Sequence, residues 1–259
     1  MSNHLTLTAI NNFPLVEAGD DLATLISQGL RKDGHALRTG DILVIVQKVV
    51  SKAEGRIVNL KDVTPSARAL ALAEETQKDA RLVELILSES KSQVRLKKGV
   101  LIVEHRNGWI MANAGIDASN VASEGDEENV LLLPVDPDKS ADIIRQKLQD
   151  QYGCDVAVVI SDSFGRPWRL GTTGVAIGAA GLPSLWDRRG DTDLFGRELK
   201  VTQLAVADEV STAASLLHGQ TDEGRPVVLL RGLDFSNFPS ARARPASDLI
   251  RDISEDMFR

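Results

Sequence analysis

Residues 156–172, VAVVISDSFGRPWRLGT, change character halfway and are the most informative stretch for the fold. Residues 156–160 are apolar and rich in β-branched side chains, which is typical of a buried strand. Residues 161–163, Ser-Asp-Ser, follow directly, and residues 165–167, Gly-Arg-Pro, are typical of a loop. A core strand that ends in a carboxylate and hydroxyls favours a functional site, because a sheet holds the loop after it rigidly.

The composition is that of a folded protein with an acidic surface. The chain has 259 residues, of which 42% are hydrophobic and 26% charged, and its net charge is -7. This charge argues against a general nucleic-acid binder. The single cysteine, Cys154, excludes an internal disulfide and a cysteine-based metal site, so we expect a cytoplasmic protein. The first residues lack the features of a signal peptide, and no apolar run reaches membrane-spanning length, so no membrane partner is expected.

Strands and helices mix along the chain without regular βαβ alternation. The dipeptide Asn107-Gly108 between two apolar arms predicts a β-hairpin. We therefore expect an α+β fold with mixed sheets and antiparallel hairpins. Residues 1–259 are expected to form a single unit of up to two intertwined subdomains, with the acidic stretch 123–129 as candidate boundary. Helices are predicted over residues 22–30, 64–77, 79–89, 140–151 and 206–217, the second capped by Thr64, and a peripheral helix is predicted in the tail after Pro239.

Three strand-like runs end in clusters of polar residues. Aspartate, serine and asparagine oxygens are hard ligands suited to Mg²⁺ or Mn²⁺, and two such clusters could share one or two ions. Lys52, together with the loops at Gly115 and Gly165, could contact phosphate. The clusters are Gln47, Lys48, Ser51 and Lys52; Asn113, Asp117, Ser119 and Asn120; and Ser161, Asp162 and Ser163.

Each cluster also has a structural interpretation that the pattern leaves open. Asp162 could cap a turn, the loop over residues 113–120 could be an ordinary tight loop, and Lys52 could be a solvated lysine. The glycines of residues 171–181 are explained by helix packing. The four histidines show no metal-binding spacing. Neither a P-loop nor a Rossmann GxGxxG after a strand is present, and no GxSxG nucleophile elbow occurs.

A series of short motifs resembles one family. In order along the chain, these motifs resemble the coenzyme F420-0:L-glutamate ligase family, up to about Leu233. They are VVSKAEGR (49–56), NAGIDASN (113–120), LLLPVDPD (131–138), SDSFGRPWRLGTTGVAIG (161–178), DLFGREL (193–199), VADEV (206–210) and LLHGQTDEGRPVVLLRGL (216–233).

The resemblance implies an activity, cofactors and an assembly. It implies GTP-dependent addition of L-glutamate to coenzyme F420-0, or a close precursor variant, through γ-glutamyl amide bonds. It also implies two divalent ions, Mg²⁺ or Mn²⁺, and stimulation by K⁺. The implied fold is an unusual mixed α+β ligase fold assembled as an intertwined homodimer. We expect no C-terminal flavin-binding domain, which some bacterial relatives carry.

The resemblance also assigns roles to residues. Its metal ligands fall on Asp117, Asp162, Ser163 and Gln220, and Asp117, Asp162 and Lys52 are the expected catalytic residues. Archaeal-type relatives carry Ser-Thr in place of Gln47-Lys48 and an acidic residue in place of Gln220. A neutral amide binds a divalent cation less well than a carboxylate does. The nucleotide contacts fall on Pro14, Leu15, Val16, Glu17, Gln47, Lys48, Lys52, Asn120, His218, Gly219, Gln220, Thr221 and Asp222.

Three functions remain to be distinguished. The first is a ligase that activates a carboxylate as an acyl phosphate. The second is a metal-dependent nucleotide phosphohydrolase that uses the same aspartate and serine ligands. The third is a non-catalytic nucleotide-binding module. The lack of any Ser-His or Cys-His pairing is consistent with a reaction that needs no nucleophilic side chain.

Overall fold

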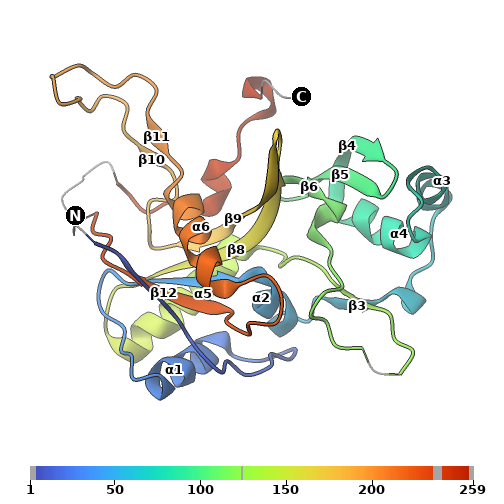
Figure 1. Cartoon of the computed structure of the whole chain (residues 1–259), viewed down its shortest axis with the longest axis horizontal. Coiled ribbons are helices and arrows are strands. Elements are labelled where there is room, and N and C mark those ends of the chain that lie inside the picture. The colour runs from blue at the N-terminus through green and yellow to red at the C-terminus, as the bar shows by residue number, and fades with distance from the viewer. Residues whose placement is uncertain (1–3, 124, 236–240, 257–259) are drawn as a thin grey trace. The chain divides into compact units, whose positions relative to one another are not determined.

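The computed structural model describes residues 4–123, 125–235 and 241–256, and the chain divides into two compact units (Figure 1). Unit 1 contains residues 1–16, 20–50 and 136–249, and unit 2 contains residues 17–19, 51–135 and 250–259. The division at residue 50 falls inside helix α2 (Gln47–Ala53). The acidic stretch 123–129 is not a boundary, because it lies within unit 2.

Unit 1 is built on a five-stranded mixed sheet. Its strands lie in the order β1-β12-β2-β8-β9, and β2 and β8 are its parallel neighbours while the other pairs are antiparallel. This arrangement confirms the α+β prediction and differs from the parallel sheet of a Rossmann fold. A second, two-stranded sheet pairs β10 with β11. The strands are β1 (Thr6–Ala9), β2 (Ile42–Val46), β8 (Ala157–Arg166), β9 (Arg169–Ala180), β10 (Trp186–Asp187), β11 (Gln203–Leu204) and β12 (Val227–Arg231).

Helices pack closely on this sheet because two glycines of β9 leave room for them. A methyl group on Gly174 would lie 2.3 Å from the carbonyl oxygen of Ser211, in helix α6 (Val206–His218). One on Gly178 would lie 2.3 Å from the carbonyl oxygen of Pro137, at the start of helix α5 (Pro137–Tyr152). Helix packing therefore does explain these glycines, as expected. Helix α1 (Leu22–Lys32) buries its apolar face and contacts α5.

Two helix carboxylates cover the open edge of β9, where backbone amides lack a neighbouring strand. Asp208 of α6 accepts a hydrogen bond from the amide of Ala176 at 2.9 Å. Asp138 of α5 accepts from the amides of Ala179 at 2.8 Å and Ala246 at 2.7 Å. These contacts satisfy the strand edge and discourage pairing with another chain there. Ala246 begins a 3₁₀ turn, Ala246–Leu249.

Unit 2 combines two helices with two small sheets. Its core cluster unites residues of both helices, such as Leu72 and Ile86, with Leu101 and Val103 of one strand. The helices are α3 (Ala67–Thr76) and α4 (Ala80–Ser88), one sheet holds β4 (Ser90–Lys97), β5 (Val100–His105) and β6 (Ile110–Ala112), and the other pairs β3 (Ile57–Asn59) with β7 (Asn129–Leu131). Short 3₁₀ turns cover Leu60–Asp62, Asn113–Gly115 and Ile253–Glu255.

Most predicted elements are present, with three differences. The hairpin at Asn107-Gly108 is confirmed by the pairing of β5 with β6. Helix α3 is capped by Ser66 rather than Thr64, because the Ser66 hydroxyl accepts the Ala69 amide at 3.2 Å. The strand predicted over residues 156–160 continues to Arg166, since β9 pairs with its polar half. Among residues 241–256 the expected peripheral helix is replaced by two short 3₁₀ turns.

Candidate functional site

The first predicted cluster forms helix α2, which begins at the residue after β2. Gln47 is buried at 3% exposure, and Ser51, one helical turn later, is fully buried. The residues of this cluster therefore lie on one helix, which buries polar side chains as well as apolar ones. In unit 2, the last turn of this helix carries Lys52, whose Nζ donates a hydrogen bond to the carbonyl oxygen of Asn120 at 2.7 Å. Two of the predicted nucleotide-binding residues, which are 68 positions apart in the sequence, are therefore in contact.

The loop over residues 113–120 turns sharply. Asn113, Ala114 and Gly115 have φ angles of 54°, 52° and 73°, a run of left-handed conformations that is rare for residues with a side chain. Gly115 has a second reason to be glycine, because a methyl group there would lie 2.6 Å from Cδ1 of Leu133. The loop is held to β7 by two backbone hydrogen bonds between Asp117 and Leu131. These bonds hold the middle of the loop in place.

Asp117 also folds its side chain back on the loop. Its Oδ1 accepts the amide of Ser119 at 2.8 Å, and its Oδ2 accepts the Ser119 hydroxyl at 2.7 Å. This is an Asx turn, so Asp117 stabilises the tight loop in which it lies. Hydrogen-bond donors on both oxygens orient the carboxylate without neutralising it, and each oxygen keeps capacity for a further ligand.

Asp162 and Ser163 lie within β8, not in a loop after it. A break in register between Ile160 and Ser161 interrupts the ladder with β9 just before them. Such a bulge changes the direction of the side chains that follow. The carboxylate of Asp162 accepts the backbone amide of Ser163 at 2.8 Å, and both residues are half-buried. The hairpin then ends at an exposed turn, where Trp168 has a φ of 59° and is 82% exposed.

His218 ends helix α6 and is held in one tautomer. Its Nδ1 lies 2.8 Å from the carbonyl oxygen of Arg225, so Nδ1 must carry the proton and donate. Burial lowers the pKa of His218 below its ordinary value of 6.5, although the hydrogen bond to Arg225 acts in the opposite direction. The ring is therefore neutral at pH 7, with an unprotonated Nε2. This buried nitrogen has no hydrogen-bond partner among the described residues.

The loop after His218 contains an acidic residue that sequence reasoning missed. The carboxylate of Glu223 accepts the amide of Thr221 at 2.8 Å, and hydrogen bonds from backbone amides of this loop lower the pKa of Glu223. Gly219 makes this possible, because a methyl group there would lie 2.0 Å from the carboxyl carbon of Glu223. Gln220 and Asp222 are exposed in the same loop. The sequence TDEG, residues 221–224, shows that this loop is acidic. It gives no reason to choose Glu223 over Asp222 as the carboxylate that accepts the backbone amides.

The predicted N-terminal segment is divided between the units. Pro14, Leu15 and Val16 belong to unit 1, where Leu15 is 90% exposed and Val16 is buried. Glu17 begins a short stretch of unit 2, which is tied to α2 by a hydrogen bond of 2.9 Å from the Gly19 amide to the Ala53 carbonyl.

The predicted residues thus fall into two groups. Unit 2 contributes one carboxylate, Asp117, and unit 1 contributes the carboxylate of Asp162. In unit 2 the structure brings together Lys52 with Asn120, and Asp117 with Ser119. In unit 1 it places Asp162 beside Ser163, and the predicted residues 219–222 in the loop that follows His218.

The oxygen donors of each unit suit a hard divalent cation whose coordination is completed by other ligands. Over residues 4–123, 125–235 and 241–256, no three His, Cys, Asp or Glu side chains gather in a group that could hold a metal ion. Mg²⁺ rarely uses such a protein cage. It is commonly bound by one or two carboxylates, water and substrate phosphates. In unit 1 the Asp162 carboxylate, the Ser163 hydroxyl and the Gln220 amide oxygen are donors of this kind, and in unit 2 the Asp117 carboxylate is one.

Comparison with known proteins decides the family. Residues 11–232 match the family model described as F420-0:Gamma-glutamyl ligase. The chain belongs to the F420-0:gamma-glutamyl ligase family. All the predicted site residues, from Pro14 to Asp222, lie inside the matched span.

Relatives within the family match over nearly their whole length. A coenzyme F420:L-glutamate ligase of Methanothermobacter thermautotrophicus is 47% identical over 98% of this chain and 99% of its own. Proteins of the same name are 48% identical in Methanopyrus kandleri, over 94% of this chain and 93% of their own, and 41% identical in Methanocaldococcus jannaschii, over 95% and 94%. The resemblance noted in the sequence is therefore confirmed.

Among the residues that the structure describes, none of the helices combines the length and apolar character needed to cross a membrane.

Proposed function

We propose that this chain is a ligase that joins L-glutamate to coenzyme F420-0, or a close precursor variant, with GTP as the activating co-substrate. The proposal is carried by family membership, because the family model covers 11–232 and relatives named coenzyme F420:L-glutamate ligase align over almost the entire chain. The activity is that of an acid–amino-acid ligase that releases GDP and phosphate.

The reaction proceeds in two steps. A carboxylate is a poor acyl donor, because an amine cannot expel oxide from it at neutral pH. In the first step a carboxylate oxygen of the precursor attacks the γ-phosphorus of GTP, the bond from that phosphorus to the bridging oxygen breaks, and GDP leaves. In the second step the amine of glutamate attacks the acyl carbon, phosphate departs with the precursor's oxygen, and the amine proton passes to solvent.

In this scheme the residues of the chain bind and orient the reactants. The ammonium of Lys52, oriented by the Asn120 carbonyl, supplies positive charge for nucleotide phosphates. The rigid loops at Asp117 and Gly219 present backbone groups at fixed positions, which lowers the entropy cost of aligning the reactants. Residues 14–17 and 47–48, together with the loop over residues 218–222, complete the proposed nucleotide contacts.

Asp117, Asp162, Ser163 and Gln220 would hold divalent cations, with the two carboxylates as the strongest donors. When bound, Mg²⁺ or Mn²⁺ neutralises charge on the phosphoryl oxygens during transfer. K⁺ is the proposed monovalent activator, and the active assembly is a homodimer.

An isotope experiment tests the chemistry. Precursor labelled with heavy oxygen in its reacting carboxylate is incubated with GTP, glutamate and Mg²⁺, and the products are analysed by mass spectrometry. We expect one labelled oxygen in inorganic phosphate for each amide formed. Label in GMP would indicate nucleotidyl transfer instead and refute the acyl phosphate. Phosphate release without glutamate, with the label kept in the precursor, would indicate a phosphohydrolase. Binding of GTP without any turnover would indicate a non-catalytic module.

A further inference from the structure

The hairpin of β8 and β9 carries two of the proposed metal ligands and ends in an unusual turn. In unit 1, Asp162 and Ser163 lie in β8, and the ribbon continues from them to residues 166–169, which we call the hairpin tip. Figure 1 shows the two strands extending together. The stretch of strand from Asp162 to Arg166 spans about 13 Å. A coenzyme-sized substrate held at Asp162 could therefore extend to the hairpin tip.

The backbone of the hairpin tip adopts an unfavourable conformation. Pro167 and Trp168 form a two-residue loop between Arg166 and Arg169, which pair across the ladder. Trp168 has a φ of 59°, a left-handed conformation that strains a bulky residue and that glycine or asparagine usually occupies in such a turn. Trp168 is 82% exposed, so burial of its ring does not offset this strain. Strain that is kept at an exposed residue indicates a functional role.

The charge of the hairpin tip is also unfavourable. Arg166 and Arg169 lie directly opposite each other in the ladder, and like charges at opposed positions of neighbouring strands repel. The sequence contains no acidic residue between Asp162 and Asp187. Within the part of the chain that the structure describes, neither of the two arginines takes part in an ion pair. An anion bound between the two guanidinium groups would remove this repulsion.

An exposed indole beside two guanidinium groups suits one class of ligand, a planar aromatic ring that is tethered to a phosphate. Aromatic ligand rings stack on the indole face, and the planar fork of arginine binds two phosphate oxygens at once. The precursor of the proposed reaction has this chemistry, because coenzyme F420-0 joins a deazaflavin ring to its reacting carboxylate through a phosphate group. GTP also has a ring and phosphates, but the proposed metal ligands would hold its phosphates away from the hairpin tip.

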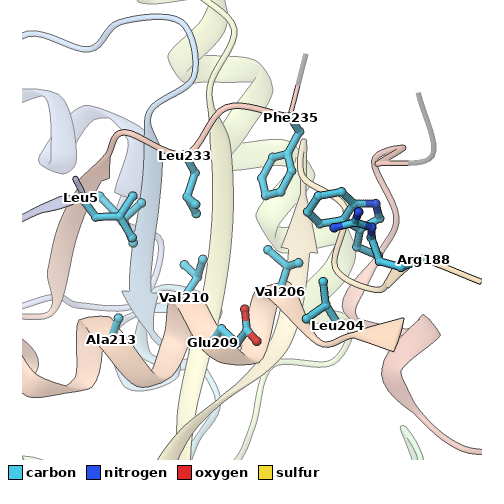
Figure 2. A pocket seen from close by; sticks show the side chains of 11 residues that line it. Leu5, Arg188, Leu204, Val206, Glu209, Val210, Ala213, Leu233 and Phe235 are labelled. Atoms are coloured by element: carbon cyan, nitrogen blue, oxygen red, sulfur yellow. The ribbon is translucent and has the colours of Figure 1, made fainter. Parts of the chain in front are cut away.

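The apolar pocket of unit 1 is a poorer site for such a ligand. Its volume is about 310 Å³, and Figure 2 shows side chains of α6 along one side with Leu233 and Phe235 across from them. The lining contains one carboxylate, Glu209, and one guanidinium, Arg188. A phosphate would meet no excess of positive charge there, and the volume is at the small end for a ligand site.

We propose that the hairpin tip binds the precursor, with the deazaflavin ring stacked on Trp168 and the phosphate held between Arg166 and Arg169. This inference rests on the proposed function and names the residues that recognise its precursor. These side chains make and break no bond. They raise the affinity for the precursor and orient it, so that its carboxylate end extends along the ribbon toward Asp162.

Equilibrium binding tests the two halves of the site separately. Binding is followed by the fluorescence of the deazaflavin ring, with coenzyme F420-0 and with the same compound lacking its phosphate, which keeps the ring and its ribityl chain. Trp168→Gly should weaken binding of both compounds about 10-fold or more, as loss of base stacking on an aromatic side chain does elsewhere. The double variant Arg166→Gln/Arg169→Gln should weaken binding of the phosphorylated compound alone.

Controls separate recognition of the precursor from a structural role. Trp168→Phe keeps an aromatic ring and should retain most of the affinity. Arg242→Gln removes an exposed arginine elsewhere in unit 1 and should change nothing. The melting temperature of Trp168→Gly should equal or exceed that of wild type, because glycine adopts a positive φ without strain. In turnover, Trp168→Gly should raise the KM for the precursor about 10-fold or more and leave the KM for GTP unchanged.

The outcomes distinguish this inference from the proposed function. Unchanged precursor binding in Trp168→Gly, by an enzyme that still ligates glutamate, would overturn the inference and leave the proposed function standing. A wild type that neither binds nor consumes the precursor would overturn the proposed function, and the inference with it. A rise in the KM for GTP alone would place the guanine base at the hairpin tip. Loss of self-association in sedimentation, with precursor binding unchanged, would make the tip an interface between copies, and either of these results would also overturn the inference.

Discussion

A single side chain, Asp117, shows how a residue can be a turn former and a proposed ligand at once. Its two carboxylate oxygens accept hydrogen bonds from the amide and the hydroxyl of Ser119, at 2.8 Å and 2.7 Å. Asp252 accepts from the amide and the hydroxyl of Ser254 in a similar turn, both at its Oδ1, at 2.8 Å and 2.6 Å, but lies outside the proposed site. The chain therefore contains a matched control for the local structure of Asp117.

The comparison of Asp117 with Asp252 leads to a prediction about the negative charge of the proposed site carboxylates. Asp117→Asn and Asp162→Asn should each lower kcat at least about 100-fold, the scale of losing charge stabilisation in a transition state. Asp252→Asn changes a similar turn and should leave kcat unchanged. The measurement is glutamate-dependent GDP release at saturating Mn²⁺, with unfolding followed in parallel. Near-normal kcat in both site variants would remove these carboxylates from the proposed machinery.

Lys52 allows a prediction about which substrate it meets. Replacing it by methionine keeps most of the side-chain length and removes the charge. We expect Lys52→Met to raise the KM for GTP about 10-fold to 100-fold, since a hydrogen bond to a charged group contributes about 1.5–3 kcal/mol. The KM for glutamate should change little. Lys61, which forms an exposed ion pair with Asp126, provides the control variant Lys61→Met. An effect confined to glutamate would place Lys52 at the acceptor site.

The contact between Lys52 and Asn120 also shows where sequence reasoning stops. Residue types and loop positions were enough to select both residues as candidates. Their contact joins positions 68 residues apart, so it depends on how unit 2 folds and not on local pattern. The position of Glu223 could not be predicted either. Its carboxyl group lies close to Gly219, and the sequence pattern of the loop does not indicate this approach.

Among the elements, strand β8 extends well beyond the apolar run from which it was predicted. Its apolar half, residues 157–160, follows from composition. Its polar half is strand only because β9 pairs with it, Ser163 lying opposite Gly174 in the ladder. Pairing with a distant partner therefore extended the strand beyond its hydrophobic pattern, and it placed Asp162 on a sheet rather than in a loop.

The close contact of β9 with α6 gives a prediction about stability. Gly174→Ala places a methyl group 2.3 Å from the Ser211 carbonyl oxygen, where backbone must move. We expect a loss of about 1–3 kcal/mol in the free energy of unfolding, as for other overpacked sites. Gly165→Ala, in the paired strand with no atom within 4 Å of the added methyl, is the control and should be neutral. Thermal unfolding measures both, and equal melting temperatures would mean that α6 does not constrain β9.

In the whole molecule, the two units are interleaved along the chain. Unit 1 is assembled from three stretches of sequence, and one boundary falls inside α2. No linker composition marks that boundary, because helix α2 runs through it with buried Ser51 on the far side. Composition and pattern could therefore predict the fold class, but not a division that only tertiary contacts create.

A cluster around Glu89 ties three segments of unit 2 together. Its carboxylate is 7% exposed and lies 3.0 Å from Arg56, 3.1 Å from Arg106 and 3.7 Å from His105. Burial alone would raise the pKa of Glu89. The nearby His105 ring and the charges of the two arginines outweigh burial, and the pKa of Glu89 lies below its ordinary value of 4.5.

The lowered pKa of Glu89 predicts how unit 2 responds to acid. A carboxyl group with a depressed pKa in the folded state contributes stability that is complete above pH 4.5 and is lost as the pH falls through the folded value. Glu89→Gln should lower the stability of unit 2 at pH 7 by about 2 kcal/mol, because two arginines lose their partner. It should also flatten the pH dependence below pH 4.5.

Hydrogen exchange of peptides from residues 51–135, in increasing urea, reports this stability separately from that of unit 1. The exposed Glu75, on α3 of the same unit, supplies the control Glu75→Gln, which should keep the wild-type profile. Since the variant removes the titrating group, a Glu89→Gln protein that still loses stability as steeply as wild type below pH 4.5 would mean that other carboxylates of unit 2 govern its acid response.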